Sequence, residues 1–226
     1  MEYKRSIYNS YYNYIDYFIV ETYIQNRDWY AGYNNIKLWR SQNNGKWRYI
    51  LYDVDQSFVD NDPDKNFIDI SRNPYRINSN NDTVDLSSMH SELFNRILMN
   101  DEFNCRFIIR YAEIINTIFH TDTFRMKSQE LKDKLTSVMP NQINRWGMPG
   151  SMTIWENKIN LFTEFNEIRV PYALKHVSES FDIDLASTRT FDISGPHMSG
   201  SHEGSIKINT INLVTYPWIG YVFNPQ

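Results

Sequence analysis

Residues 34–55 read NNIKLWRSQNNGKWRYILYDVD, and the fold prediction starts from this stretch. Two runs that are typical of strands, residues 36–40 and 46–54, flank the pair Asn44-Gly45. An Asn-Gly pair between apolar runs is the strongest short signal for a β-hairpin, because both residues accept positive φ angles. We therefore expect a hairpin over these residues.

The register of this hairpin decides which polar side chains lie together. With a two-residue loop, Ile36 faces Asp53 and Asn34 faces Asp55. Side chains alternate along a strand, so Asp53 and Asp55 should point to the same side, with Asn34 beside them at the open end of the hairpin. A four-residue loop keeps this parity, whereas a three-residue loop replaces Asn34 with Asn35.

Two carboxylates and an amide oxygen at the end of a hairpin form a cluster of oxygen ligands. Hard cations such as Mg²⁺ take ligands of this kind and complete their coordination with water or substrate phosphates. Two close carboxylates also repel each other unless a cation lies between them. The pattern therefore predicts a metal site at Asp53, Asp55 and Asn34. The alternative is that the two aspartates simply end a strand.

Asp28 follows a predicted helix over residues 11–25 and comes shortly before Asn34. A protein kinase needs a carboxylate near the substrate hydroxyl group, an asparagine on a metal ion, and an aspartate between metal and phosphate. In ordinary kinases these residues come in the order aspartate, asparagine, hairpin, aspartate. The order is the same here, with Asp53 last. The alternative interpretation is that Asp28 begins a loop or pairs with Arg27 at the end of the helix.

The remainder of the chain predicts an α+β protein that is mainly helical. Apolar residues recur at intervals of three or four in several segments. We expect helices over residues 101–120 and 123–138, a helix with a capping box at Thr153 and Glu156, and a last helix that Pro171 opens or kinks and that ends near residue 181. Residues 56–88 are polar and predict a long irregular insertion, while residues 204–210 predict a strand.

The composition argues against several other kinds of protein. The formal net charge of −4 at pH 7 argues against a surface that binds nucleic acid by neutralising phosphates. The single cysteine excludes an internal disulfide framework. No segment is apolar over the ~18 residues that a membrane span needs. Residues 1–5 lack the apolar core of a signal peptide, so we expect an intracellular protein or one whose targeting sequence is missing.

Several motifs along the chain can be compared with known families. They are IDYFI at 15–19, NRDW at 26–29, NNIKLWR at 34–40, GKWRYILYDVD at 45–55, LFNRIL at 93–98, and the segments 139–147 and 194–210. In order and spacing these motifs resemble the CotH kinase family of atypical protein kinases. The resemblance covers nearly the whole chain.

The resemblance implies a distant kinase fold that binds Mg²⁺ and ATP and transfers phosphate to serine or threonine residues of proteins. It implies that Asp28 is the catalytic aspartate and that Asn34 or Asn35 is the metal-binding amide. Asp53 would be the metal-binding aspartate, with Asp55 as a supporting or second ligand. Namesakes of the family act on spore-coat proteins, and related proteins occur on bacterial and fungal surfaces. The full-length protein is therefore expected at the cell surface or in the spore coat.

The start of the chain departs from the family pattern. Family members carry an upstream β-rich lobe that holds the ATP phosphates, but here only residues 1–10 precede the first predicted helix. We therefore expect this lobe to be missing or to be supplied by another chain. Residues 1–184 should form a kinase-like C-terminal lobe. Residues 185–226 should form a linker and a β segment that is cut short.

These observations predict a fragment of a CotH-like Ser/Thr kinase that uses Mg²⁺ and ATP in its full-length form and is weak or inactive alone. The alternative is a catalytically inactive surface or adhesion module with the same fold. A second alternative is a metal-dependent hydrolase that uses Asp53 and Asp55 and needs no ATP.

Overall fold

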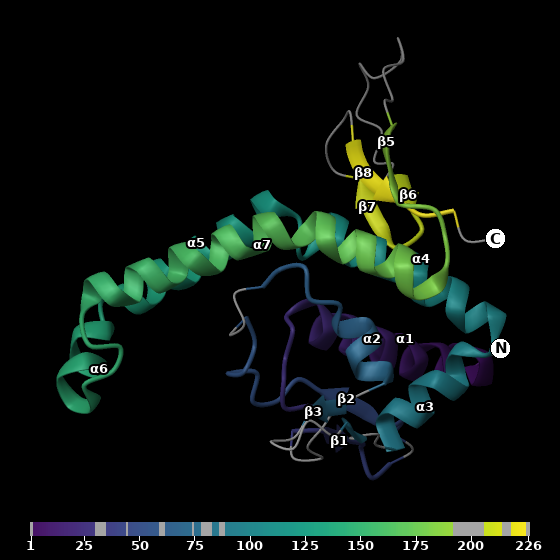
Figure 1. Cartoon of the computed structure of the whole chain (residues 1–226), viewed down its shortest axis with the longest axis horizontal. Coiled ribbons are helices and arrows are strands. Elements are labelled where there is room, and N and C mark those ends of the chain that lie inside the picture. Colours follow the sequence, from purple (N-terminus) through teal and green to yellow (C-terminus); the bar gives the residue numbers. More distant parts are fainter. Residues whose placement is uncertain are drawn as a thin grey trace. The chain divides into compact units, whose positions relative to one another are not determined.

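The structure is a computed structural model that describes residues 2–29, 35–43, 45–58, 62–73, 75–77, 83–85, 89–191, 206–213 and 218–224. The chain divides into two compact units (Figure 1). The first unit comprises Met1–Arg110 and Glu179–Asp182, and the second comprises Tyr111–Ser178 and Ile183–Gln226. Helices α4 (Asp101–Thr117) and α7 (Met152–Phe181) contribute residues to both units.

The first unit begins with a long helix, followed by short strand pairs and further helices. Besides the start of α4 and the end of α7, its elements are α1 (Glu2–Tyr23), β1 (Lys37–Trp39), β2 (Arg48–Ile50), α2 (Phe67–Arg72), β3 (Tyr75–Ile77), β4 (Thr83–Asp85) and α3 (Met89–Leu98). Strand β1 pairs with β2 and β3 pairs with β4, both antiparallel.

Aromatic rings around α1 form the core of the first unit. The Phe18 ring stacks on the Phe94 ring with 3.5 Å between centroids, and it meets the Trp29 ring edge-on at 5.0 Å. All three side chains are buried. Such rings bury large apolar areas, and favourable ring pairs add roughly 0.5–1.5 kcal/mol each. Because Trp29 directly follows Asp28, its burial fixes the loop that carries Asp28 against α1.

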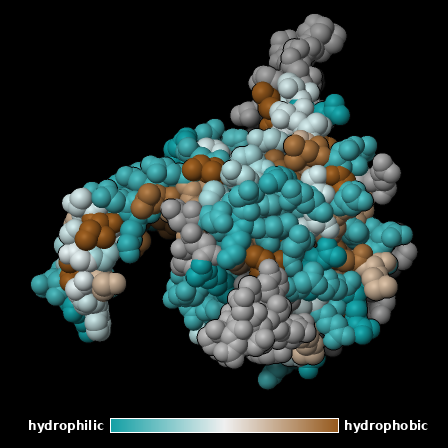
Figure 2. Space-filling model, viewed as in Figure 1, coloured by the Kyte–Doolittle hydropathy of each residue, from teal (hydrophilic) through white to brown (hydrophobic). Residues whose placement is uncertain are grey.

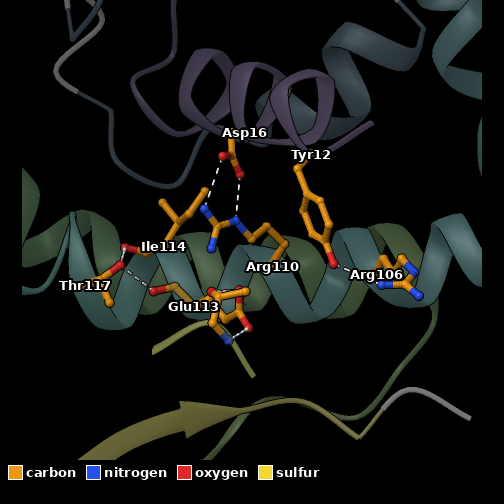
Figure 3. Close-up of polar contacts among 8 residues, drawn as sticks. Tyr12, Asp16, Arg106, Arg110, Glu113, Ile114 and Thr117 are labelled. Atoms are coloured by element: carbon orange, nitrogen blue, oxygen red, sulfur yellow. Dashed lines mark hydrogen bonds and ion pairs between the residues drawn. The ribbon is translucent and has the colours of Figure 1, made fainter. Parts of the chain in front are cut away.

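Two arginines of α4 hold α1 in place within the first unit (Figure 3). Arg110 Nε donates to Asp16 Oδ1 at 2.6 Å, and Arg110 Nη2 donates to Asp16 Oδ2 at 3.1 Å. Arg106 Nη1 donates to the Tyr12 hydroxyl group at 3.0 Å. A bidentate arginine–carboxylate pair is stronger and more directional than a single exposed ion pair. The helix that leads to Asp28 is therefore firmly oriented.

The hairpin of β1 and β2 forms as predicted, and its register is not that of the two-residue loop. Leu38 pairs with Tyr49, whereas the two-residue loop would place Arg40 opposite Tyr49. Ile36 therefore does not face Asp53. The observed register is the one that a four-residue loop over residues 42–45 would give, and Asn44 itself lies outside the described residues.

Contacts between Tyr49 and α1 explain the observed register. The backbone N–H of Tyr49 donates to Asn13 Oδ1 at 2.7 Å, and Asn13 Nδ2 donates to the backbone oxygen of Tyr49 at 3.2 Å. The Tyr49 ring lies 5.0 Å from the Tyr14 ring and 4.9 Å from the Tyr17 ring, between centroids. The Asn13 amide thus pairs with the backbone of β2 as a neighbouring strand would. The turn sequence alone does not reveal these tertiary contacts.

The segment predicted as an irregular insertion, residues 56–88, contains a helix that packs into the core. Phe67 and Ile68 of α2 are 0% exposed. Asn66 caps this helix, because its Oδ1 accepts from the backbone N–H groups of Ile68 and Asp69 at 3.1 and 3.3 Å. The prediction of irregular structure is therefore wrong at α2. Two apolar side chains and a capping asparagine are enough to form a short buried helix within a polar stretch.

The second unit consists of helices followed by short strands. Besides its parts of α4 and α7, its elements are α5 (Thr121–Thr136), α6 (Met139–Trp146), β5 (Ser187–Phe191), β6 (Ile206–Ile208), β7 (Ile211–Leu213) and β8 (Trp218–Val222). Strand β5 pairs with β8 and β6 pairs with β7, both antiparallel. Strand β6 lies within the predicted strand over residues 204–210. The prediction of a mainly helical α+β protein is confirmed.

Helices α5 and α7 lie side by side and antiparallel in the second unit (Figure 1). The Phe124 and Phe162 rings meet at 4.7 Å between centroids, and Arg125 forms an ion pair with Glu167. Figure 2 shows separate apolar patches on the mostly hydrophilic surface of these helices. Met126, Leu131, Leu135 and Leu161 of these helices are exposed. No helix in the described part of the chain is long and apolar enough to cross a membrane.

Pro171 lies inside α7, which continues from Met152 to Phe181. Pro171 therefore does not open a separate last helix, one of the two outcomes that the sequence predicted. Val170, Ala173 and Leu174 around it are buried. Their burial offsets the backbone hydrogen bond that a proline inside a helix removes.

Two polar side chains of α4 hold the C-terminal strands in the second unit. Asn116 Nδ2 donates to the Tyr221 backbone oxygen at 2.8 Å, and the Tyr221 backbone N–H donates to Asn116 Oδ1 at 2.8 Å. The carboxyl group of Glu113 accepts from the Thr210 backbone N–H at 3.1 Å and from its hydroxyl group at 2.6 Å. Asn116 thus pairs with Tyr221 in the same way as Asn13 pairs with Tyr49.

Candidate functional site

The C-terminal end of α1 turns sharply into the loop that carries Asp28. Helix α1 ends at Tyr23, and Gln25 has a φ angle of 56°, which the α-helix does not allow. The Gln25 side-chain amide donates to the backbone oxygens of Asp62 and Lys65 at 2.9 and 3.2 Å. The beginning of the loop is therefore tied to the segment that precedes α2.

Two backbone hydrogen bonds bring this loop next to the segment that follows the hairpin. The Arg27 N–H donates to the Gln56 oxygen at 3.4 Å, and the Phe58 N–H donates to the Ile24 oxygen at 3.0 Å. Asp28 adjoins Arg27 in the sequence, and Asp55 adjoins Gln56. The segments that carry the two aspartates therefore lie side by side in the first unit.

Asp28 is half-buried and pairs with one of the two asparagines that the sequence predicted. Asn35 Nδ2 donates to Asp28 Oδ2 at 2.9 Å, and Asn35 is only 7% exposed. Asp28 Oδ1 is buried and has no hydrogen-bond partner among the described residues. A buried acceptor without a donor is costly, so this oxygen needs an explanation, and a catalytic role is one.

A second buried carboxyl group, that of Glu21, lies close to Asp28. Glu21 is 0% exposed, and its Oε2 accepts from Asn26 Nδ2 at 2.8 Å. Burial is the main cause that raises the pKa of Glu21 from 4.5 to about 7, with a smaller rise from the negative charge of Asp28, while the Asn26 amide opposes the shift. Near neutral pH the Glu21 carboxyl group is therefore partly protonated.

Glu21 is not among the site residues predicted from the sequence. A signal was nevertheless present, because Glu21 continues the helical spacing of the buried residues Tyr14 and Phe18 on α1. An acidic residue on the apolar face of a helix is rarely buried without a partner. Its position shortly before the Asp28 loop makes it a candidate for the site.

Asp53 and Asp55 lie beyond the end of β2 and are exposed. Residues 51–54 have no regular secondary structure, and Asp53 has a φ angle of 54°. Aspartate accepts this left-handed conformation more easily than most residues. The alternation of side chains along a strand therefore does not extend to these two residues, and that part of the prediction is corrected.

The available oxygen donors suit Mg²⁺ in their chemistry. The carboxylates of Asp53 and Asp55 and the amide of Asn35 supply oxygen ligands, which hard cations prefer. Among the described residues, no group of three or more His, Cys, Asp or Glu side chains could hold a metal ion. A Mg²⁺ ion here would therefore need amide, water or phosphate oxygens as well, as this cation usually does. Asn34, the other predicted ligand, lies outside the described residues.

Comparison with known proteins identifies the family. The family described as CotH kinase protein matches residues 10–172, a range that contains Glu21, Asp28, Asn35 and both aspartates after the hairpin. No curated protein and no solved structure matches the chain significantly. Because the matched range covers well over half of the sequence, the chain belongs to the CotH kinase family.

Proposed function

We propose that this chain provides the catalytic and metal-binding residues of a protein Ser/Thr kinase that uses ATP and Mg²⁺. The observation that carries the proposal is the contact between the Asp28 loop and the segment after the hairpin, made by the Arg27–Gln56 and Phe58–Ile24 hydrogen bonds. The hydrogen bond from Asn35 to Asp28 adds the third residue type that phosphoryl transfer requires. The family membership supports the same reaction class.

Asp28 is the proposed acceptor of the substrate's hydroxyl proton. Its Oδ2 is directed by the Asn35 amide, and its Oδ1 has no partner among the described residues. As the substrate oxygen bonds to the γ-phosphorus, the bond from that phosphorus to the bridging oxygen breaks and ADP leaves. The hydroxyl proton passes to the Asp28 carboxylate.

Asp53 and Asp55, together with Asn35 or Asn34, are the proposed ligands of Mg²⁺. When bound, Mg²⁺ neutralises the negative charge of the ATP phosphates. The exposed position of both aspartates leaves their oxygens accessible to a phosphate-bound cation. A serine or threonine hydroxyl group of a protein is the proposed phosphate acceptor.

Two assays test the proposal together. Titration calorimetry measures ATP binding in the presence and absence of Mg²⁺, and a radiolabel assay measures phosphate transfer to protein acceptors. We expect ATP binding that depends on Mg²⁺ and label on serine or threonine. Both assays should use the chain and the longest natural protein that contains it. If neither binds ATP with Mg²⁺, the kinase proposal is rejected in favour of an inactive surface module.

A further inference from the structure

Among the residues that the structure describes near the proposed site, Glu21 has a buried carboxyl group to which the proposed reaction gives no role. It lies in the last turn of α1, next to the side chains of Tyr17 on the same helix and Asp28 on the following loop. Both Glu21 and Asn26 are 0% exposed. Burial of a carboxyl group costs free energy, whereas an apolar residue would fill the same space without that cost.

Glu21 holds Asn26 through two separate hydrogen bonds. The Asn26 backbone N–H donates to the Glu21 backbone oxygen at 3.1 Å, and the Asn26 side-chain amide donates to the Glu21 carboxyl group at 2.8 Å. Only Arg27 separates Asn26 from Asp28. On the other side of the loop the Arg27 N–H makes a longer bond of 3.4 Å to Gln56. The shortest of these contacts is therefore the one between the Glu21 and Asn26 side chains.

We propose that Glu21 is a positioning residue for Asp28, which acts through Asn26 to fix the loop in the orientation that phosphoryl transfer needs. This inference rests on the proposed kinase function. Glu21 touches neither ATP nor the substrate hydroxyl group in this scheme. Its effect is to restrict the directions in which the Asp28 carboxylate can point, and small errors in such directions are costly in catalysis.

Two substitutions of Glu21 separate its hydrogen bond from its charge. Glu21→Gln keeps an oxygen that can accept from Asn26, whereas Glu21→Leu keeps the volume and removes the acceptor. Glu113→Gln is the matched control, because Glu113 is a buried glutamate, 5% exposed, that holds Thr210 in the second unit. Each full-length variant is compared with wild type in kcat, KM for ATP, and amide hydrogen exchange at residues 26–29.

We expect Glu21→Leu to lower kcat by about tenfold with little change in KM for ATP, because one buried hydrogen bond is lost. Amide hydrogen exchange at residues 26–29 should become faster by a similar factor. Glu21→Gln should retain most of the activity and the slow exchange. Glu113→Gln should leave kcat and this exchange unchanged. Asn26→Ala combined with Glu21→Leu should be no worse than either change alone, because both remove the same contact.

The outcomes distinguish this inference from the proposed function. If wild type transfers phosphate but Glu21→Leu has normal kcat and normal exchange, Glu21 does not position the loop. If exchange increases in Glu21→Leu while kcat stays normal, the residue only stabilises the fold and the inference is also overturned. If wild type transfers no phosphate at all, the kinase proposal fails. If Glu21→Leu does not fold, Glu21→Gln still tests the proposal, because it keeps the acceptor for Asn26. A folded Glu21→Gln with normal hydrogen exchange at residues 26–29 but a lowered kcat would contradict the proposed role.

Discussion

The two acidic segments of the candidate site differ in how firmly the fold holds them. Asp28 lies in a loop fixed by the buried Trp29 ring, and its carboxylate accepts from an asparagine that is 7% exposed. Asp53 and Asp55 are exposed and lie outside regular secondary structure. In a kinase this contrast has a simple interpretation. In the proposed mechanism, Asp28 would be oriented before the substrate binds, whereas Asp53 and Asp55 would become ordered as the metal–phosphate complex binds.

The first prediction concerns Asp28, where we expect the largest effect. Asp28→Asn should lower kcat by about 10²–10⁴-fold, the range for loss of a general base. The melting temperature should change little, because asparagine can occupy the same space. A phosphate-transfer assay at saturating Mg²⁺ and ATP measures this loss. Normal turnover in Asp28→Asn would remove this residue from the mechanism.

The second prediction concerns the exposed segment, where the effect should depend on Mg²⁺. Asp53→Asn should lower kcat/KM by about 10²-fold at low Mg²⁺, because one charged ligand is lost. Raising the Mg²⁺ concentration should restore part of the activity. The same increase should restore nothing in Asp28→Asn. A loss in Asp53→Asn that is independent of Mg²⁺ would contradict its role as a metal ligand.

The third prediction tests the hydrogen bond between Asn35 and Asp28. Asn35→Ala should lower kcat by about tenfold or more, since a hydrogen bond to a carboxylate contributes about 1.5–3 kcal/mol. Asn116→Ala in the second unit is a suitable control, because it also removes an asparagine that makes two side-chain hydrogen bonds. This control should lower the melting temperature and leave kcat near the wild-type value. Equal effects of the two changes on kcat would show that Asn35 is only structural.

The fourth prediction concerns stability and pH. The pKa of Glu21 is raised in the folded state from 4.5 to about 7, so the folded protein binds a proton that the unfolded chain releases. This contribution to stability is fully present below pH 4.5 and is lost as the pH rises to about 7 and above. It amounts to at most about 3 kcal/mol. Denaturant unfolding measures the free energy of unfolding at pH 5 and at pH 8. This free energy should fall more between pH 5 and pH 8 in wild type than in Glu21→Gln. Equal losses in both proteins would exclude this titration.

Much of the fold follows from patterns in the sequence. The helical spacing of Tyr14 and Phe18 predicts α1, and the two apolar runs around Asn44-Gly45 predict β1 and β2. The sequence left the loop length open, because the Asn13 amide and the aromatic rings of α1 determine where Tyr49 lies. Contacts between distant segments also explain why Phe67 and Ile68 form a buried helix within a polar stretch.

The candidate site was predicted only in part for similar reasons. Asp28 and Asn35 were selected from the order of polar residues, and the structure brings their side chains together. The expected arrangement of Asp53 and Asp55 depended on strand alternation, which ends at Ile50 in the structure. Glu21 was overlooked because it lies inside a helix whose pattern predicts a core residue. A carboxyl group on such a face is a signal in its own right.

The most direct test of the account compares Asp28→Asn and Asp53→Asn in calorimetric titrations with ATP and Mg²⁺. We expect Asp28→Asn to bind ATP with Mg²⁺ as tightly as wild type while transferring phosphate at least about 10²-fold more slowly. Asp53→Asn should lose the binding that depends on Mg²⁺. If both variants bind ATP with Mg²⁺ like wild type and transfer phosphate normally, the assignment of a catalytic buried segment and a metal-binding exposed segment is wrong.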